Sequence, residues 1–273
     1  MEILVADPAG NITVFVLEAI EKAEDRAALA RAILAEKNLG AEQVGFVFPP
    51  GSKSPLWHLE MAGGEFCGNA ARCFGLYAAR LQGLKGKAEL FVSVSGAETP
   101  LRVEADLEKS RARAEMPKPL LIETIDYKGR PLPLFIFEGI SHVIAPGLKP
   151  DRESFLAIKL LTESKLKGLF ARGNGPGSFA ALGVMFFDTG ACYLHPAVHV
   201  SSTDTLVFES SCGSGAAAIG LWLCREMRDG ARKFTITQPG GLIETEVIKK
   251  SGEISSVTIG GEVKLGECRT FPL

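Results

Sequence analysis

The sequence predicts an α+β fold built from two similar halves, each with strands on either side of one central helix. Two observations support this prediction. The segments CGNAARCFGLYAARL (67–81) and CGSGAAAIGLWLCRE (212–226) share six identities in fifteen aligned positions. Each is followed by a β-type run and then by a related turn segment, SGAETPLRV in the first half and PGGLIETEV in the second. Both helices carry almost no charge, which suits burial within a layer of strands.

Length and composition are those of a globular protein and exclude several classes of function. The 273 residues are 46% hydrophobic and 23% charged, with a net charge of −2. Such a chain can bury a sizeable core but offers no basic patch for nucleic acid or an anionic membrane. The N-terminal segment MEILVADPAG lacks the regions of a signal peptide, and no apolar run reaches membrane-spanning length. We therefore expect a cytoplasmic protein.

The first half is expected to begin with a strand pair in residues 1–20, because DPAGN separates two β-rich runs with a proline and a glycine. A helix should follow over about 21–37, with Leu29, Ile33 and Leu34 on its apolar face and NLG at its C-terminal end. Strands should flank the turn-rich loop FPPGSKSP.

The first cysteine helix should run over about 68–81 and stop at Gly83, followed by strands in AELFVSVSG and TPLRVEADL. EMPKPLL carries two prolines and is interpreted as the crossover between the halves. The expected domains are 1–117, which carries Cys67, and 118–273, which carries Cys212. A return of the last strand to the first half is left open.

The second half should open with strands around 131–145 and an amphipathic helix over about 152–167. The apolar side of that helix is assigned to Phe155, Ile158 and Leu161. RGNGPGSFA (172–180) is expected to be a glycine-rich loop, and the second cysteine helix should end near RDG. The remainder alternates apolar and polar residues between glycine turns, which predicts a meander of strands.

Each repeated cysteine stands at the start of a helix. Backbone N–H groups there lack intrahelical partners and carry partial positive charge, so they bind a carboxylate and stabilise a thiolate. Gly68 and Gly213 would let a substrate approach the backbone. If the two copies face one another, one thiolate can remove a proton α to the carboxylate, and the opposite thiol can protonate the other face. This scheme needs no cofactor, and no dinucleotide or phosphate-loop motif is present.

A core role would be the ordinary interpretation of Cys67 alone, but its recurrence in register at Cys212 favours catalysis. A disulfide between these two is a third interpretation, expected only as an oxidation product of an active-site pair. Metal binding is not expected, because the histidines are scattered and no Cys-x-x-Cys occurs. The other four cysteines are expected to be small core residues: Cys73, Cys192, Cys224 and Cys268.

The two cysteine motifs resemble those of a known enzyme family. CGNAARCF and CGSGAAA are similar to the two catalytic motifs of diaminopimelate epimerase, and AGN near the start and GAEQ after the first helix extend the likeness. The resemblance implies two pseudo-symmetric domains, each a β-barrel-like sheet wrapped around a central helix. It also implies catalysis without pyridoxal phosphate, with Cys67 and Cys212 as proton acceptor and donor. The substrate-binding positions that it implies are Asn11 and Gln43 near the reacting centre, and Gly68, Asn69, Gly213 and Ser214 as carboxylate-binding amides.

Three segments depart from diaminopimelate epimerase. Its Asn-Pro-His stretch corresponds to GISHVI, and its Glu-Arg-Gly run corresponds to STDTLVFESSC, which has no arginine. Its asparagine upstream of the first cysteine motif is absent from HLEMAGGEFC. A second substrate carboxylate would therefore lack a partner, which is costly for a buried charge. The signature MAGGEFCGNA, GISHVI and ESSCGSG resembles the histidine racemases of this superfamily, known from opine-type metallophore pathways.

The sequence therefore predicts a cofactor-independent amino-acid racemase with histidine as the leading substrate, and the family suggests a homodimer. Glu209 either helps to select the amino group or side chain of the substrate, or is an acid favoured by the helix dipole. His142 is expected to be a hydrogen-bonded loop or strand residue.

Other functions are left open. The first is a diaminopimelate epimerase with a diverged distal pocket, followed by a proline or hydroxyproline racemase. An isomerase of the phenazine-biosynthesis type is disfavoured, because its second half lacks the matching cysteine. The last is a non-catalytic small-molecule binding protein of the same fold, against which the presence of both cysteines argues.

Overall fold

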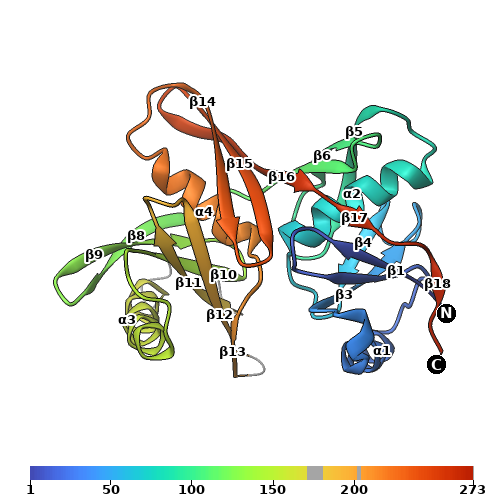
Figure 1. Cartoon of the computed structure of the whole chain (residues 1–273), viewed down its shortest axis with the longest axis horizontal. Coiled ribbons are helices and arrows are strands. Elements are labelled where there is room, and N and C mark those ends of the chain that lie inside the picture. The colour runs from blue at the N-terminus through green and yellow to red at the C-terminus, as the bar shows by residue number, and fades with distance from the viewer. Residues whose placement is uncertain (171–180, 202–203, 273) are drawn as a thin grey trace. The chain divides into compact units, whose positions relative to one another are not determined.

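The chain divides into two compact units, shown as ribbons in Figure 1. In this computed structural model, unit 1 comprises Met1–Met116 with Thr258–Leu273, and unit 2 comprises Pro117–Val257. The structure describes residues 1–170, 181–201 and 204–272, so the glycine-rich segment expected at 172–180 lies outside the described residues. Within those ranges, no helix combines the length and the apolar character needed to span a membrane.

Unit 1 is a curved sheet with helices on both faces. Its elements are β1 (Glu2–Asp7), β2 (Thr13–Val16), α1 (Ala23–Ala35), the 3-10 helix η1 (Lys37–Leu39), β3 (Gln43–Phe48), β4 (His58–Met61), α2 (Gly68–Leu81), β5 (Lys87–Val94), β6 (Leu101–Asp106), β7 (Arg111–Glu115), the end of β16 (Glu253–Glu262), β17 (Lys264–Leu265) and β18 (Arg269–Thr270).

Unit 2 contains a second curved sheet and two more helices. Its elements are β8 (Leu121–Tyr127), β9 (Arg130–Ile136), β10 (Ile140–Pro146), α3 (Arg152–Phe170), β11 (Ala181–Asp188), β12 (Tyr193–Val200), β13 (Thr205–Phe208), α4 (Gly213–Leu223), β14 (Gly230–Gln238), β15 (Gly241–Lys250) and the start of β16.

The two units repeat one pattern of strand pairing. In unit 1, β1 and β2 pair antiparallel, β2 and β3 parallel, β3 and β4 antiparallel, β4 and β5 parallel, and β5 and β6 antiparallel. In unit 2 the same alternation runs through β9, β10, β11, β12, β14 and β15. A helix joins the parallel partners at equivalent steps, so the duplicated α+β fold expected from the sequence is confirmed.

In unit 1 the sheet buries a different apolar set on each face. The α2 face includes Phe15, Val47 and Leu59, and the α1 face includes Val14 and Phe46. This is the period-two alternation expected of a strand that is covered on both sides. Helix α2 is buried along almost its whole length, which explains why most of its residues are apolar or small.

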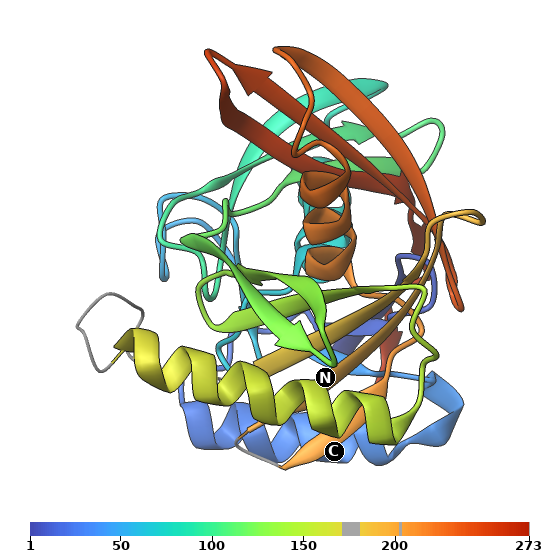
Figure 2. The ribbon, with the colours of Figure 1, turned by 90° about the vertical axis from the view of Figure 1, so that its left-hand side faces the viewer.

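Unit 2 is layered in the same way. Leu182 and Val184 of β11 pack in one apolar cluster with Phe155 of α3. On the opposite face, the Phe187 ring meets the Trp222 ring of α4 edge-on, with centroids 6.1 Å apart. Figure 2 shows α4 and α3 on opposite sides of these strands.

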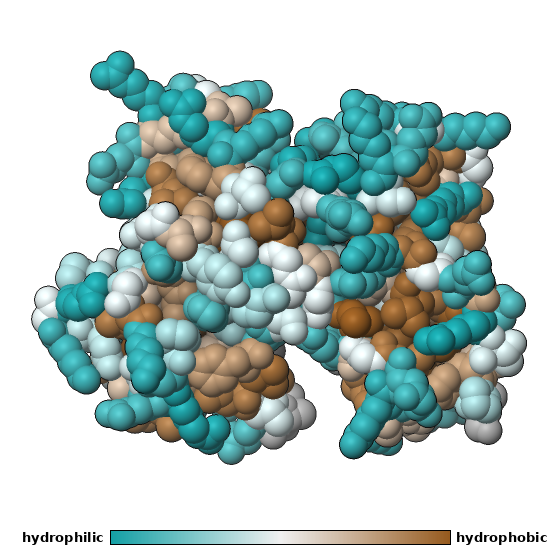
Figure 3. Space-filling model, in the orientation of Figure 1, coloured by the Kyte–Doolittle hydropathy of each residue, from teal (hydrophilic) through white to brown (hydrophobic). Residues whose placement is uncertain are grey.

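Both central helices approach the sheet at a matched glycine. A Cβ on Gly75 would collide with Val103 of β6, and a Cβ on Gly220 would collide with Thr245 of β15. The recurrence of glycine at this aligned position thus has a packing cause. The outer face of β5 and β6 is mostly polar apart from Phe91, which is half-exposed, and the surface over these strands is largely hydrophilic in Figure 3.

Several details of the sequence-based prediction are wrong. Leu34 and Leu161 are 43% and 41% exposed, because the buried stripes of α1 and α3 are narrower than expected. In α3, Thr162 is buried instead, and its hydroxyl donates to Ile158 O at 2.8 Å. Cys268 is exposed and Cys192 is only half-buried, whereas Cys73 and Cys224 lie in the core as expected.

Helix α4 also ends earlier than expected, at Leu223 rather than near RDG. Hydrogen bonds from Arg225 N to Trp222 O and from Met227 N to Cys224 O tighten the chain into turns there. Lys249 of β15 donates to the carbonyl oxygens of Arg225 and Met227 at 3.3 and 2.9 Å, so the end of the helix is satisfied from the sheet.

Candidate active site

Cys67 and Cys212 have the same local geometry, each as the N-cap residue of its helix. Cys67 has φ −128° and ψ 110°, and its Sγ accepts from Ala70 N at 3.4 Å. Cys212 has φ −130° and ψ 113°, and its Sγ accepts from Gly215 N at 3.4 Å. Each sulfur takes the place of the serine or aspartate oxygen that usually caps a helix. The positive end of the helix dipole therefore acts directly on the sulfur and favours its thiolate form.

Two carboxamide side chains lie beside Cys67. Its thiol donates to Gln43 Oε1 at 3.0 Å, and Asn11 Oδ1 is 3.9 Å from the sulfur. Gln43 begins β3, and Asn11 is a buried residue of the β1–β2 loop whose Nδ2 donates to Glu42 Oε2 at 3.1 Å. Two candidate residues from distant parts of the sequence, Asn11 and Gln43, thus lie beside the sulfur of Cys67.

The first turn of α2 uses its side chains for packing. A Cβ on Gly68 would lie 2.7 Å from Met116 Sδ, so a larger residue there would have to displace the end of this methionine. Asn69 Oδ1 accepts from Arg72 Nη2 at 3.5 Å, and this fully buried arginine also donates to Pro8 O at 2.7 Å. The carboxamide of Asn69 therefore braces the core, and a carboxylate would meet its backbone N–H group instead.

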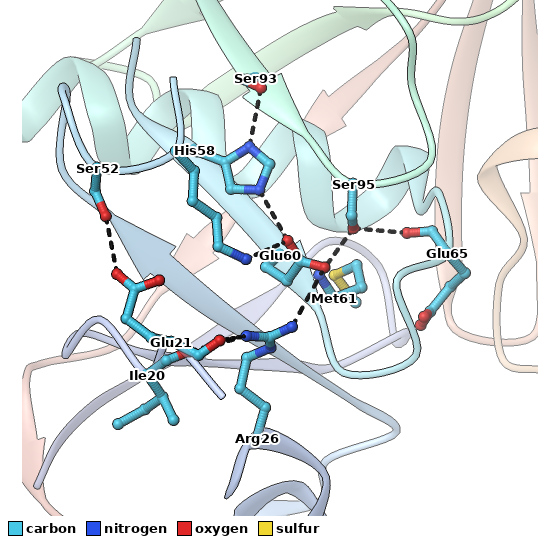
Figure 4. A network of polar contacts seen from close by, with 11 residues as sticks. Ile20, Glu21, Arg26, Ser52, His58, Glu60, Met61, Glu65, Ser93 and Ser95 are labelled. Carbon is cyan, nitrogen blue, oxygen red and sulfur yellow. Dashed lines mark hydrogen bonds and ion pairs between the residues drawn. The ribbon is translucent and has the colours of Figure 1, made fainter. Parts of the chain in front are cut away.

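The chain leading to Cys67 is held by the end of β5, as Figure 4 shows. Ser95 Oγ accepts from Met61 N and donates to Glu65 O, both at 2.9 Å. Gly96 follows with φ 69°, and a Cβ there would collide with the backbone of Glu65 and Phe66. The GGEF segment is therefore fixed on both sides just before the thiol.

A charged cluster holds the same region from the other side (Figure 4). Glu60 of β4 contacts Lys53 Nζ at 2.9 Å, His58 Nε2 at 3.1 Å and Arg26 Nη2 at 3.7 Å. Burial raises the pKa of Glu60, but the hydrogen bonds from Lys53 and His58 outweigh it and hold the pKa below its ordinary value. Glu60 is thus a carboxylate that ties α1 and the β3–β4 loop to the strand preceding the thiol.

Cys212 is surrounded by different groups. Ser214 Oγ lies 3.6 Å from the Cys212 sulfur and 2.8 Å from His142 Nε2. His142 is fully buried on β10, and burial alone lowers its pKa to about 3, so the imidazole is neutral near pH 7. A chain of polar contacts therefore runs from a buried neutral imidazole through a hydroxyl to the thiol.

Gln238, the last residue of β14, also contacts Cys212. Its Oε1 accepts from Cys212 N at 2.8 Å, and the side chain is 2% exposed. Sequence reasoning missed Gln238 and Ser95, although each directly precedes a Pro-Gly or Gly-Ala turn after the strand that follows its cysteine helix. It expected His142 to be a hydrogen-bonded loop or strand residue, and His142 lies in β10, but its contact with Ser214 was not predicted.

The pKa of the Cys212 thiol lies well above its ordinary value. Burial is the largest cause, and the nearby Glu209 carboxylate raises the pKa further. The hydrogen bonds with Ser214 and the Gly215 N–H oppose this shift. Cys212 is therefore a thiol near neutral pH and is suited to donate a proton before it accepts one.

These opposing effects predict that Glu209→Gln lowers the pKa of Cys212, whereas Ser214→Ala raises it. The pH dependence of Cys212 alkylation by iodoacetamide, followed by peptide mass spectrometry, measures both shifts. Glu226→Gln is the matched control, because this acid is 87% exposed beyond the far end of α4. Shifts in the same direction for Glu209→Gln and Ser214→Ala would contradict this electrostatic assignment.

All six cysteines are free thiols. Among the described residues, no group of three or more histidine, cysteine, aspartate or glutamate side chains is arranged to hold a metal ion. Each helix end offers a thiol, backbone N–H donors and a carboxamide, and the Cys212 end adds the Ser214 hydroxyl, the His142 imidazole and the Glu209 carboxylate.

Comparison with known proteins gives one consistent family. The family model described as the histidine racemase CntK N-terminal domain matches residues 1–267. A histidine racemase from Fusobacterium nucleatum subsp. nucleatum (strain ATCC 25586) is 34% identical over 252 residues, covering 89% of this chain and 88% of that protein. A histidine racemase from Staphylococcus aureus (strain Mu50) is 28% identical over 242 residues, covering 87% and 85%.

Solved structures agree at the level of the fold. A hydroxyproline epimerase from Agrobacterium vitis with bound trans-4-hydroxy-L-proline has a TM-score of 0.62 at 15% identity, covering 98% of this chain and 91% of that one. A probable proline racemase from Agrobacterium radiobacter with bound carbonate has a TM-score of 0.61 at 16% identity, covering 100% and 93%. The α+β fold expected from the sequence is that of these epimerases and racemases.

Proposed function

The chain belongs to the histidine racemase family, an isomerase family, and from this premise we propose that it inverts the α-carbon of free histidine with Cys67 and Cys212 as its acid and base. The single observation that carries the proposal is the matched N-cap geometry of the two cysteines. A buried structural cysteine has no reason to recur at a helix start with the same φ, ψ and sulfur contact.

The proposed reaction moves one proton out and one proton in. A thiolate on one face removes the α-proton, and the electron pair of the C–H bond delocalises into the adjacent carboxylate. The thiol on the other face then donates its proton to the carbon. The two sulfurs exchange protonation states in each turnover, and the reverse reaction restores them.

For one enantiomer, Cys67 as a thiolate removes the α-proton and Cys212 supplies a proton from the opposite face. The raised pKa of Cys212 supports this assignment, because it keeps the thiol protonated. The Gln43 oxygen now faces a protonated Cys67 sulfur. Rotation of that carboxamide would present Nε2 to the sulfur and stabilise the thiolate, so Gln43 can serve both states.

When Cys212 has lost its proton and acts as the base, His142 and Ser214 stabilise its thiolate. With His142 Nε2–H donating to Ser214 Oγ, the serine hydroxyl can donate to the Cys212 thiolate. In this tautomer His142 Nδ1 carries a lone pair and no hydrogen. A buried lone pair without a partner costs less than a buried N–H without one. The neutral histidine thus polarises the serine without adding charge.

A substrate with a single carboxylate fits the residues near Cys212 better than diaminopimelate does. The Glu-Arg-Gly run that supplies an arginine in diaminopimelate epimerase is replaced by STDTLVFESSC. Glu209, whose carboxylate acts on the Cys212 thiol, could instead accept from the ammonium or imidazole N–H of histidine. The family resemblance supports a homodimer as the assembly.

The test is α-proton exchange in deuterium oxide with L-histidine, other L-amino acids and meso-diaminopimelate, followed by proton NMR. Exchange and loss of optical rotation with histidine, well above every other substrate, are the expected results. Exchange confined to diaminopimelate would reject histidine and leave the two-cysteine chemistry standing. No exchange with any amino acid would favour a binding protein of the same fold.

A further inference from the structure

Gln238 is held at Cys212 in one defined orientation. Its Oε1 accepts from Cys212 N at 2.8 Å, and a backbone N–H can only donate, so the oxygen must face the cysteine. Two residues further on, Gly240 N donates to Ser210 O at 2.7 Å. The end of β14 is thereby bonded on both sides of Ser211, and the carboxamide has little freedom to turn.

The other half of this carboxamide is unsatisfied. Gln238 Nε2 is buried and has no hydrogen-bond partner among the described residues, although the side chain is only 2% exposed. Buried amide donors in native proteins are nearly always paired, because leaving one unpaired forfeits its hydration without replacement. Among the described residues, the two Nε2 hydrogens are therefore left available for an acceptor on a bound ligand.

Ser95, which holds the approach to the cysteine in unit 1, has no unsatisfied donor. Ser95 directly follows β5, as Gln238 ends β14, and both residues hold the chain that leads to the cysteine of their unit. The Ser95 hydroxyl uses its acceptor for Met61 N and its donor for Glu65 O. Ser95 is therefore fully occupied in holding the protein, whereas Gln238 holds the protein with its oxygen alone.

We propose that Gln238 is a substrate-binding residue whose Nε2 donates a hydrogen bond to the α-carboxylate of the amino acid bound at Cys212. The proposal rests on the proposed function. The carboxylate docks at the first-turn N–H groups of α4. Cys212 is the N-cap residue of this turn, and its N–H is bonded to Oε1 of the same carboxamide that carries Nε2. A neutral donor suits this place, because its bond strengthens as the carboxylate gains charge in the transition state.

The imidazole of the substrate is the competing acceptor, and ligands that carry only one of the two groups distinguish them. Imidazole-4-propionate keeps the imidazole and the carboxylate of histidine. Histamine keeps the imidazole and the amine but lacks the carboxylate. A residue that binds the carboxylate affects only the first of these ligands.

The test compares Gln238→Met with Thr245→Val as the matched control. Methionine keeps the length and burial of Gln238 but removes both polar atoms. Thr245 is a buried residue of β15 whose hydroxyl donates to Ala216 O of the same helix at 3.3 Å, so its loss probes only the packing of α4. Binding of both ligands is measured by calorimetry, and kcat and KM for L-histidine by α-proton exchange.

For Gln238→Met we expect kcat/KM to fall about tenfold or more, through a rise in KM that matches the weaker binding of the carboxylate and a further fall in kcat. Binding of imidazole-4-propionate should weaken about tenfold, whereas histamine should bind as it does to the unaltered protein. Thr245→Val should change neither. Equal weakening of both ligands, weakening of histamine alone, or full activity of Gln238→Met would overturn the proposal.

The binding measurements distinguish a failure of this inference from a failure of the proposed function. If the unaltered protein exchanges no α-proton but binds imidazole-4-propionate in a Gln238-dependent way, the racemase assignment fails and the carboxylate contact stands. If the protein racemises histidine and Gln238→Met binds imidazole-4-propionate normally, the function stands and the contact is rejected.

Discussion

Replacing either Cys67 or Cys212 with alanine should lower kcat for racemisation about 10³-fold or more, because each cysteine serves as the only proton carrier on its face of the substrate. The two losses should be similar, although the sulfurs have different neighbours. Removing both should cost little more than removing one, since either loss already interrupts the transfer. Chiral chromatography of histidine incubated with each variant measures the effect.

The chain supplies matched controls for these substitutions. Cys73 lies in the same helix as Cys67, and Cys224 caps the C-terminal end of the helix that begins after Cys212; both are buried free thiols. Cys73 is fully buried in the apolar core around α2, so a substrate cannot reach its thiol. Cys73→Ala and Cys224→Ala should keep near-normal kcat. An active Cys67→Ala or Cys212→Ala variant would reject the two-base mechanism.

Gly96→Ala should have the largest effect among single changes outside the two cysteines. Gly96 has φ 69°, and a Cβ there meets the Glu65 carbonyl carbon at 2.8 Å and collides with Phe66. We expect the free energy of unfolding to fall by about 3 kcal/mol or more, the sum of left-handed strain and a backbone clash. Since Phe66 directly precedes Cys67, kcat should fall as well.

The substitution Gly83→Ala separates the left-handed strain from the backbone clash. Gly83 has nearly the same φ, 68°, but no atom lies within 4 Å of the position that a Cβ would occupy there. Only the left-handed strain remains, which costs about 1–2 kcal/mol. Urea denaturation of both variants, together with histidine exchange, gives the comparison. Equal destabilisation by the two substitutions would show that the backbone clash at Gly96 adds no cost. Normal kcat in Gly96→Ala would show that the contact with Phe66 does not position the thiol.

Features set by local sequence were predictable. The repeated Cys-Gly helix starts identified the duplication and the two N-cap cysteines, because capping and glycine preference act within a few residues. The strand pair around DPAGN and the strands flanking FPPGSKSP formed as expected for the same reason. Strands β7 and β8 were not predicted, since their short runs mix small, charged and apolar residues.

Features that depend on tertiary contacts were not predictable. The exposure of Leu34 and Leu161 follows from how much of each helix the sheet covers, which helical periodicity does not determine. The contacts of Ser95, His142 and Gln238 each join a strand to a distant cysteine helix or its approach. Nothing local in SVSG, GISHVI or TQPGG distinguishes these polar residues from others in strands or turns.

The contacts of the GISHVI segment in the structure explain how its residues are accommodated. GISHVI forms β10, where His142 pairs with Gly183 of β11, and a Cβ on that glycine would collide with the imidazole. Gly183 therefore leaves room for the buried imidazole of His142 beside Ser214. The segment expected to replace the Asn-Pro-His stretch of diaminopimelate epimerase thus places a neutral imidazole against Ser214, which contacts the Cys212 thiol.

The central claim is that two thiols act on opposite faces of the α-carbon of histidine. It is tested most directly by incubating L-histidine with the protein in deuterium oxide and separating the enantiomers while only a small fraction of the L-histidine has been converted. The claim predicts that D-histidine carries deuterium at the α-carbon from the outset, while the recovered L-histidine still carries protium. Deuterium entering recovered L-histidine as fast as D-histidine, or D-histidine retaining protium, would contradict it.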